Sequence, residues 1–367
     1  MMNHRGMTDP SSLQDPVRYS AGRREVLAGS AGALMLSAFM ARTARAAQSL
    51  TVSDPGGAWS PADDVAFIKP FEKATGVHIN HVARQSYPSD QIKADVEAKS
   101  YTWDVVTATI ADVYELDKNG DLLEKLDWSS PDMKQIMPQA RRSNWMGTDT
   151  YATVIAYRTS KYGKNGPTSW ADFWNVEKFP GRRAMHKHPI DTLEEALLAD
   201  GVPMDKLYPI DMNRAFKKLD QIKNHVAVWW TTGAQTTQML ESGEVDMLPA
   251  WNGRAQVVID AGKPAAISWN QGIYSMEGWV IPKGDPRAAL GRKFVAFTAN
   301  AKRQAKLVEH LSYGPTNPHA YDFIPKERAA KLPTAPQNLK LMVESNTAWW
   351  GENKEKAIQR FNAWLLS

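Results

Sequence analysis

The sequence predicts an α/β fold with two lobes, and three observations lead to this prediction. Segments with the periodicity of strands and helices alternate within residues 50–108 and again within residues 225–282. A β-branched and aromatic run at 151–157 separates these two parts. The chain of 367 residues is also longer than one ordinary hydrophobic core. Because strands that alternate with helices pair into parallel sheets, each part is expected to form its own sheet.

The first part is expected to begin with a strand at 50–57, which ends in a Pro-Gly-Gly turn. An amphipathic helix follows at 61–75, where apolar side chains recur at helical spacing until Gly76. The other elements expected in this part are strands at 77–82 and 103–108 and helices at 91–99 and 112–119.

The second part holds the clearest alternation of the chain. Strands at 225–230 and 245–250 each lead through a glycine-containing turn into a helix, and these helices are expected at 235–240 and 254–261. The remaining elements are expected as strands at 184–185 and 278–282, helices at 169–174, 194–200, 212–222, 286–298 and 301–310, and a mostly helical tail at 339–366.

Two turns of the second part are candidate binding loops. Residues 231–234 and 251–254 directly follow strands, and ligands bind where the carboxyl ends of parallel strands meet. The second turn carries Trp251, the amide of Asn252 and a glycine that allows close backbone approach. A role in the core is equally open for Trp251, because most of the 14 tryptophans must be packed.

The charge of the chain argues against a nucleic-acid partner. Of the formal net charge of +4, the first 47 residues contribute +3, with six arginines against three acids. The rest of the chain, with 38 basic and 37 acidic side chains, carries no basic stripe. There is no cysteine, which excludes thiol catalysis, cysteine-bound metals and a lipid-anchored N-terminus.

The N-terminal residues have the pattern of an export signal. Arg23 and Arg24 precede an apolar run at 26–41, and Ala44-Arg45-Ala46 forms a small-x-small cleavage site. The run is shorter than the roughly 20 residues needed to span a bilayer, so membrane insertion is not expected. The paired arginines favour twin-arginine translocation, while Gly22 and Val26 leave the general secretory route open. Either route predicts a periplasmic protein.

Five segments together carry a resemblance to a known family. They are WDVV at 103–106, SWADFWNVEKFPGR at 169–182, GEVDMLPAWNGRA at 243–255, GIYSMEGWVIPKG at 272–284 and YGPTNP at 313–318. In this order and spacing the chain resembles the spermidine/putrescine-binding branch of the periplasmic solute-binding proteins of ABC importers. The resemblance implies a type II periplasmic-binding fold, with two α/β lobes, crossing strands near 151–157 and 279–282, and a cleft that closes by a hinge motion.

On this basis the chain is divided into five parts. We expect a signal peptide at 1–46, the first part of lobe 1 at 47–153, lobe 2 at 154–280, the return to lobe 1 at 281–312, and a C-terminal hinge loop with helices that pack across the lobes at 313–367.

The resemblance also implies a polyamine ligand held by carboxylates and aromatic faces. The acids that match are Asp191, Glu194 and Glu277, and the aromatic residues that match are Trp251 and Tyr313. Three positions depart from the pattern. Ser275 stands where a Trp is expected, Ile110 beside Thr109 stands where a Tyr is expected, and the loop around Asp54 lacks the expected Trp-Thr pair. The predicted ligand-binding set is Asp54, Thr109, Asp191, Glu194, Trp251, Asn252, Arg254, Ser275, Glu277 and Tyr313.

Fewer aromatic side chains are expected at the site than in the family pattern, and this thinned aromatic box leaves a second ligand class open. Arg254, His186, Lys187 and His188 could meet a carboxylate, as an amino acid, 4-aminobutyrate or an opine-like ligand would require. Alternatively, Lys187 and the two histidines lie on the solvated surface and do not contact a ligand. Helix capping is the alternative for the acids at 191 and 194.

An enzyme exported in its folded state is the competing class of function. The sequence has no nucleophile elbow, zinc-protease or phosphate-loop motif. The histidines at 186 and 188 with the acid at 191 have no recurring metal spacing. We therefore predict no catalytic residue, cofactor or metal. The expected role is that of a monomer that delivers a small amine to ABC permease subunits.

Overall fold

The computed structural model describes residues 49–84 and 87–367. The predicted signal peptide at 1–46, with its paired arginines, lies outside the described residues. Within the described ranges, no helix combines the length and the apolar character that crossing a membrane requires.

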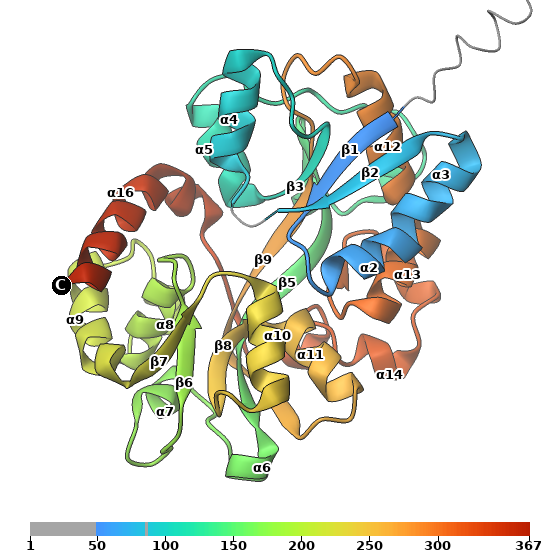
Figure 1. Ribbon diagram of the computed structural model, residues 1–367. Coiled ribbons are helices and arrows are strands. Elements are labelled where there is room, and N and C mark those ends of the chain that lie inside the picture. Colours follow the sequence, from blue (N-terminus) through green and yellow to red (C-terminus); the bar gives the residue numbers. More distant parts are fainter. Residues whose placement is uncertain (1–48, 85–86) are drawn as a thin grey trace, which may run out of the picture. The chain divides into compact units, whose positions relative to one another are not determined.

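The strands form one mixed sheet in the order β2-β1-β3-β9-β5-β8-β6-β7. The sheet contains two groups of parallel strands. One group has β1 between β2 and β3, and the other has β6 between β7 and β8. Between the groups, β5 and β9 run antiparallel to each other and connect the two (Figure 1). The strands span Ser49–Asp54 (β1), His78–Ala83 (β2), Val105–Thr109 (β3), Trp145–Arg158 (β5), Arg183–His186 (β6), Val226–Trp230 (β7), Met247–Trp251 (β8) and Ala265–Val280 (β9), with short strands at Arg141–Arg142 (β4), Gly314–Pro315 (β10) and Val343–Glu344 (β11).

Helices cover both groups of strands, as the α/β prediction requires. The first lobe consists of β1–β3 with helices α2 (Trp59–Asp63), α3 (Lys69–Thr75), α4 (Ser89–Ala98) and α5 (Ile110–Lys118). The second lobe consists of β6–β8 with α7 (Trp170–Trp174), α8 (Thr192–Ala199), α9 (Met212–Ile222), α10 (Gly233–Ser242) and α11 (Asn252–Asp260). The other helices are α6 (Thr159–Tyr162), α12 (Ala288–Thr298), α13 (Ala301–His310), α14 (Lys326–Ala329), α15 (Pro336–Leu339) and α16 (Thr347–Leu366). The predicted two-lobe α/β fold is thus confirmed.

Local sequence explains where several of these helices begin and end. The helix predicted at 61–75 is present, with a π-helical turn at Asp64–Ile68 between α2 and α3, and it ends at Gly76 in the left-handed conformation (φ 71°). Thr109 and Asp112 form a reciprocal capping box at the start of α5. Thr232 and Gln235 form a second capping box, at the start of α10. Both capping boxes therefore position the residues at the carboxyl ends of β3 and β7.

The second crossing strand, β9, is much longer than the strand predicted at 278–282. Its first half contains Ser, Asn, Gln and Gly, which have low strand propensity. It is held in the sheet by pairing with β5 along nearly its whole length. Irregular register between Gly147 and Asp149, and again between Thr153 and Ile155, bends β5 where it passes between the lobes.

Each lobe has its own hydrophobic core, and helix α16 contacts both lobes. Trp350 and Phe361 of α16 are buried in the core of the second lobe. On the same helix, the Lys354 ammonium lies 2.6 Å from Asp112 and 2.7 Å from Glu115 of α5 in the first lobe. The C-terminal helix therefore joins the two lobes through apolar packing on one side and a buried ion pair on the other.

Candidate functional site

A cavity of about 90 Å³ lies between the two lobes, where the carboxyl ends of their strands meet. A cavity needs only about 10–15 Å³ to hold one water molecule, so this volume has room for several waters, and hence for a small solute. Both candidate binding loops reach it, through Thr231 to Gly233 and through Trp251 with Arg254. Of the residues predicted from the sequence, the cavity wall includes Thr109, Asp191, Trp251, Arg254, Ser275, Glu277 and Tyr313.

Three predicted residues are not in the wall, because their polar atoms are used elsewhere. Asn252 accepts a hydrogen bond from the Ala152 amide at 3.0 Å and donates to the Ser312 carbonyl at 2.6 Å. Glu194 accepts from the Tyr208 hydroxyl at 2.5 Å and from the Trp350 indole at 2.6 Å. Both side chains are fully buried and connect segments around the site.

Asp54 is the third residue outside the wall. Its carboxylate accepts hydrogen bonds from the Gly56 amide at 2.6 Å and the Ser60 hydroxyl at 2.7 Å. Its other oxygen lies 2.6 Å from His81. The neighbouring Pro55 lines the cavity instead.

Arg254 is the strongest cationic feature of the cavity. Its side chain is fully buried, and none of its three guanidinium nitrogens makes a well-formed hydrogen bond to a described residue, although the Tyr313 hydroxyl lies beside it. The guanidinium lies against two glycines, since a Cβ atom would come within 2.8 Å of Nε at Gly233 and within 3.0 Å of Nη1 at Gly57. A buried cation without well-formed hydrogen bonds is costly, and a carboxylate from a ligand would satisfy it with paired hydrogen bonds.

Asp191 provides an acid on the same wall. It occupies the N-cap position of α8 with φ 66°, an uncommon conformation for a residue with a side chain. Its side chain does not cap the helix, so the capping alternative is wrong for this residue. Instead, one oxygen accepts a hydrogen bond from the Thr153 hydroxyl at 2.6 Å. Burial raises the pKa of Asp191 to about 6, so the carboxylate is still mostly ionised at neutral pH.

The other charged groups of the wall have partners within the protein. Glu277 lies 3.3 Å from the guanidinium of Arg84. Asp112 lies 2.6 Å from the ammonium of Lys354, and although burial would raise the pKa of Asp112, that ammonium holds it below its usual range. Burial lowers the pKa of His186 to about 3, so its imidazole is neutral. This leaves Arg254 and Asp191 as one cation and one anion without an ionic partner among the described residues.

Asp149 lies near Arg254 but does not neutralise it. The side chain is buried, and neither carboxylate oxygen has a hydrogen-bond donor among the described residues. Burial, followed by the charges of Glu277 and Asp63, raises the pKa of Asp149 well above its usual range. Burial therefore disfavours a negative charge on this carboxyl, and no ion pair joins it to Arg254 among the described residues.

The aromatic wall differs from the sequence-based expectation. The departures at 275, 109 and 54 predicted a thinned aromatic box, yet the cavity is lined by Tyr87, Tyr151, Trp251, Tyr313 and Trp350. Trp251 is half-buried and packs edge-on against Trp230, with ring centroids 5.5 Å apart, so it serves the wall and the core together. Apolar faces are thus available for the methylene groups of a ligand.

Several residues that line or adjoin the cavity were left open or missed, and four of them show why. His186 lines it, and His188 is buried and stacks on Tyr87 at 4.4 Å, whereas Lys187 is exposed. Arg84 was missed, although it directly follows β2 and the rule used for the other loops would have found it. Tyr87 lies in a connection without periodicity, and no pattern in the sequence points to it.

Comparisons with known proteins agree with a binding protein of this architecture. The family model described as "Bacterial extracellular solute-binding protein" matches residues 66–337. A gamma-aminobutyric acid-binding protein of Pseudomonas aeruginosa is 38% identical over 89% of this chain and 94% of its own length. The solved structure of the binding protein MotA of A. tumefaciens B6, in complex with glucopine, is 32% identical over 87% of this chain and 100% of its own, with a TM-score of 0.81. A spermidine/putrescine-binding periplasmic protein of Escherichia coli K12 is 23% identical over 74% of this chain and 79% of its own.

Proposed function

The chain belongs to the bacterial extracellular solute-binding protein family, and we propose that it is the periplasmic component of an ABC importer that captures 4-aminobutyrate or a similar ω-amino carboxylate. This was the alternative ligand class in the sequence analysis, and it replaces the polyamine as the main interpretation. The relatives are substrate-binding proteins, which favours delivery to permease subunits over catalysis.

The observation that carries the proposal is the state of Arg254. A fully buried guanidinium that faces a cavity and makes no well-formed hydrogen bond among the described residues carries a free-energy cost, and an anionic ligand would remove that cost. A carboxylate matches the planar arrangement of guanidinium N–H groups and can accept two hydrogen bonds at once. A polyamine has no anionic group, and it would place additional positive charge beside this side chain.

The amine of the ligand is assigned to Asp191. Because Glu277 is paired with Arg84, and Asp112 with Lys354, Asp191 is the remaining acid of the wall. One cation and one anion without internal partners match a zwitterion with one charge of each sign. The methylene groups between those charges would lie against the aromatic faces of Tyr151 and Trp251.

The likeness to relatives supports the same ligand class. The protein that is 38% identical is named for gamma-aminobutyric acid, whereas the one named for spermidine and putrescine is only 23% identical.

The proposal is tested by calorimetric titration of the exported protein with 4-aminobutyrate, putrescine, butyrate and n-butylamine. We expect 4-aminobutyrate to bind more tightly than either ligand with a single charge, and more tightly than putrescine. In Arg254→Met its affinity should fall at least about tenfold, because one charged hydrogen bond contributes roughly 1.5–3 kcal/mol. Lys187→Met removes an exposed cation beside the site and should leave affinity unchanged. Tighter binding of putrescine, or wild-type affinity in Arg254→Met, would overturn the proposal.

A further inference from the structure

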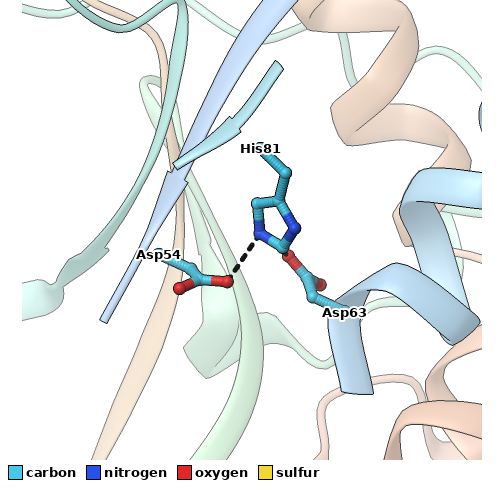
Figure 2. A group of neighbouring side chains, drawn as sticks. All are labelled: Asp54, Asp63 and His81. Carbon is cyan, nitrogen blue, oxygen red and sulfur yellow. Dashed lines mark hydrogen bonds and ion pairs between the residues drawn. The ribbon is translucent and has the colours of Figure 1, made fainter. Parts of the chain in front are cut away.

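A second polar cluster lies in the first lobe, outside the cavity wall. Asp54 ends β1, Asp63 lies in α2 and His81 lies in β2. One potential ligand atom from each of the three side chains lies within 4.8 Å of the others. Figure 2 shows the imidazole of His81 between the two carboxylates, with Asp63 pointing toward the ring. Both aspartates are fully buried, and the histidine side chain is 12% exposed.

The hydrogen bonds around this cluster orient its members toward a common point. One oxygen of Asp54 is held by the Gly56 amide and the Ser60 hydroxyl, which leaves the other oxygen to face His81 at 2.6 Å. On the opposite side of the ring, Nδ1 of His81 lies 2.8 Å from a carboxylate oxygen of Asp64. A histidine that binds a metal through one ring nitrogen usually donates its other ring N–H to a carboxylate. In His81 the second role falls to Nδ1, which faces Asp64, and Nε2 faces the acids at 54 and 63.

Asp63 supplies an independent observation that points to a ligand. Neither of its oxygens accepts a hydrogen bond from any described residue, although the side chain is fully buried. One of these oxygens lies 3.7 Å from Nε2 of His81. A buried carboxyl with no donor costs free energy, and a cation at the centre of the cluster would remove that cost.

We propose that Asp54, Asp63 and His81 bind a divalent transition-metal ion of the Zn²⁺ class. Such ions accept imidazole nitrogen and carboxylate oxygen together, at about 2.0–2.2 Å from each ligand atom. Two atoms on a tetrahedral ion lie roughly 3.3–3.6 Å apart, so the 3.7 Å separation is close to what is needed, whereas the 2.6 Å separation must widen by roughly 0.7–1 Å. Two carboxylates balance the charge of the ion, and water completes the tetrahedral shell. Although burial would lower it, the hydrogen bond and charge of Asp54 raise the pKa of His81 to about 9, so the ion displaces a proton from Nε2 to solvent as it binds.

The ligand set also selects against other cations. Ca²⁺ takes about six to eight oxygen ligands, and Mg²⁺ requires an octahedral shell of oxygens. Two carboxylates and one imidazole satisfy neither requirement. The sequence analysis predicted no metal because the one cluster that it considered, at 186, 188 and 191, has no recurring metal spacing. It did not bring residues 54, 63 and 81 together. They meet only because β1 and β2 pair in parallel, with Val52 beside His81, and α2 follows β1 directly.

The position of this cluster connects it to the solute cavity. Asp54 is followed by Pro55, which lines the cavity, and by Gly57, which lies against the guanidinium of Arg254. An ion held by Asp54 would therefore restrain the segment at 55–57. We expect the ion to stabilise the first lobe first and to tighten solute binding only as a consequence.

The test uses the exported protein after treatment with a chelator, titrated with Zn²⁺ and no other ligand. Calorimetry should show one ion bound per chain, and the melting temperature should rise with Zn²⁺. His81→Gln and Asp63→Asn should each weaken Zn²⁺ binding at least about tenfold. The matched control is His78→Gln, since His78 lies on the same strand, is exposed and pairs with Glu72 at 3.1 Å, outside the cluster. Its Zn²⁺ affinity should equal that of the wild type.

Several outcomes would overturn the metal site. They are the absence of Zn²⁺ binding to the wild type, unchanged affinity in Asp63→Asn, or an equal loss in His78→Gln. Asp63→Asn replaces a carboxyl that has no donor with an amide of the same shape, so it decides the question even if His81→Gln does not fold. Because the titration contains no solute, its result is independent of the ligand proposed for the cavity.

Discussion

Replacing Lys354 with methionine should loosen the attachment of α16 to the first lobe. The ammonium lies 2.6 Å from Asp112 and 2.7 Å from Glu115, and all three side chains are largely buried. Removing one partner of a buried ion pair costs about 3–5 kcal/mol, because the remaining charge has no compensation. Asp112 lines the cavity and can be hydrated there, so we expect about 2–4 kcal/mol.

The pH dependence of this loss follows from the pKa of Asp112. Although burial would raise this pKa, Lys354 holds it below its usual range in the folded protein. The pair therefore contributes stability that is present above about pH 4 and is lost as the pH falls through the folded pKa. The difference between wild type and variant should therefore be roughly constant from pH 7 to about pH 5 and should shrink as the pH falls below about 4.

Thermal and denaturant unfolding, followed by circular dichroism, measure the effect. At about 2–4 °C for each kcal/mol, the melting temperature should fall by about 4–16 °C at neutral pH. Lys356→Met is the matched control, because Lys356 is an exposed lysine on the same helix. If both variants unfold at the same temperature, or if the loss does not depend on pH, the ion pair does not hold the helix as argued.

Two further predictions concern the cavity. Burial raises the pKa of Asp191 to about 6, so the affinity for 4-aminobutyrate should weaken about tenfold between pH 7 and pH 5, as a proton competes with the ammonium group. Calorimetry over this range measures it, and a profile for the wild type as flat as that of Asp191→Asn would contradict the assignment. Gly233→Ala would place a Cβ atom 2.8 Å from Nε of Arg254 and from the ring of Trp251, so affinity should fall at least about tenfold while the fold persists. Unchanged binding would show that the guanidinium is not confined there.

Most secondary-structure elements could be predicted from the sequence because they rest on local rules. The helix at 301–310 follows from spacing of apolar side chains, and the end of α3 follows from Gly76. The strand-turn-helix units at 225–261 were predicted for the same reason, and they placed Trp251 and Arg254 on one edge. The first half of β9 could not be predicted, because its strand conformation comes from pairing with β5.

In the candidate site, too, some features follow from local sequence and others from tertiary packing. The sequence alone determined which side chains stand at the carboxyl ends of strands, and so it located most of the wall. Only the tertiary structure decided which charges remain unpaired, because Arg84 meets Glu277 and Lys354 meets Asp112 across 193 and 242 residues of chain. It also turned Glu194 and Asn252 inward to hydrogen-bond partners that no local pattern specifies. Charge pairing depends on distances in space, and those distances exist only once the lobes and the C-terminal helix have packed.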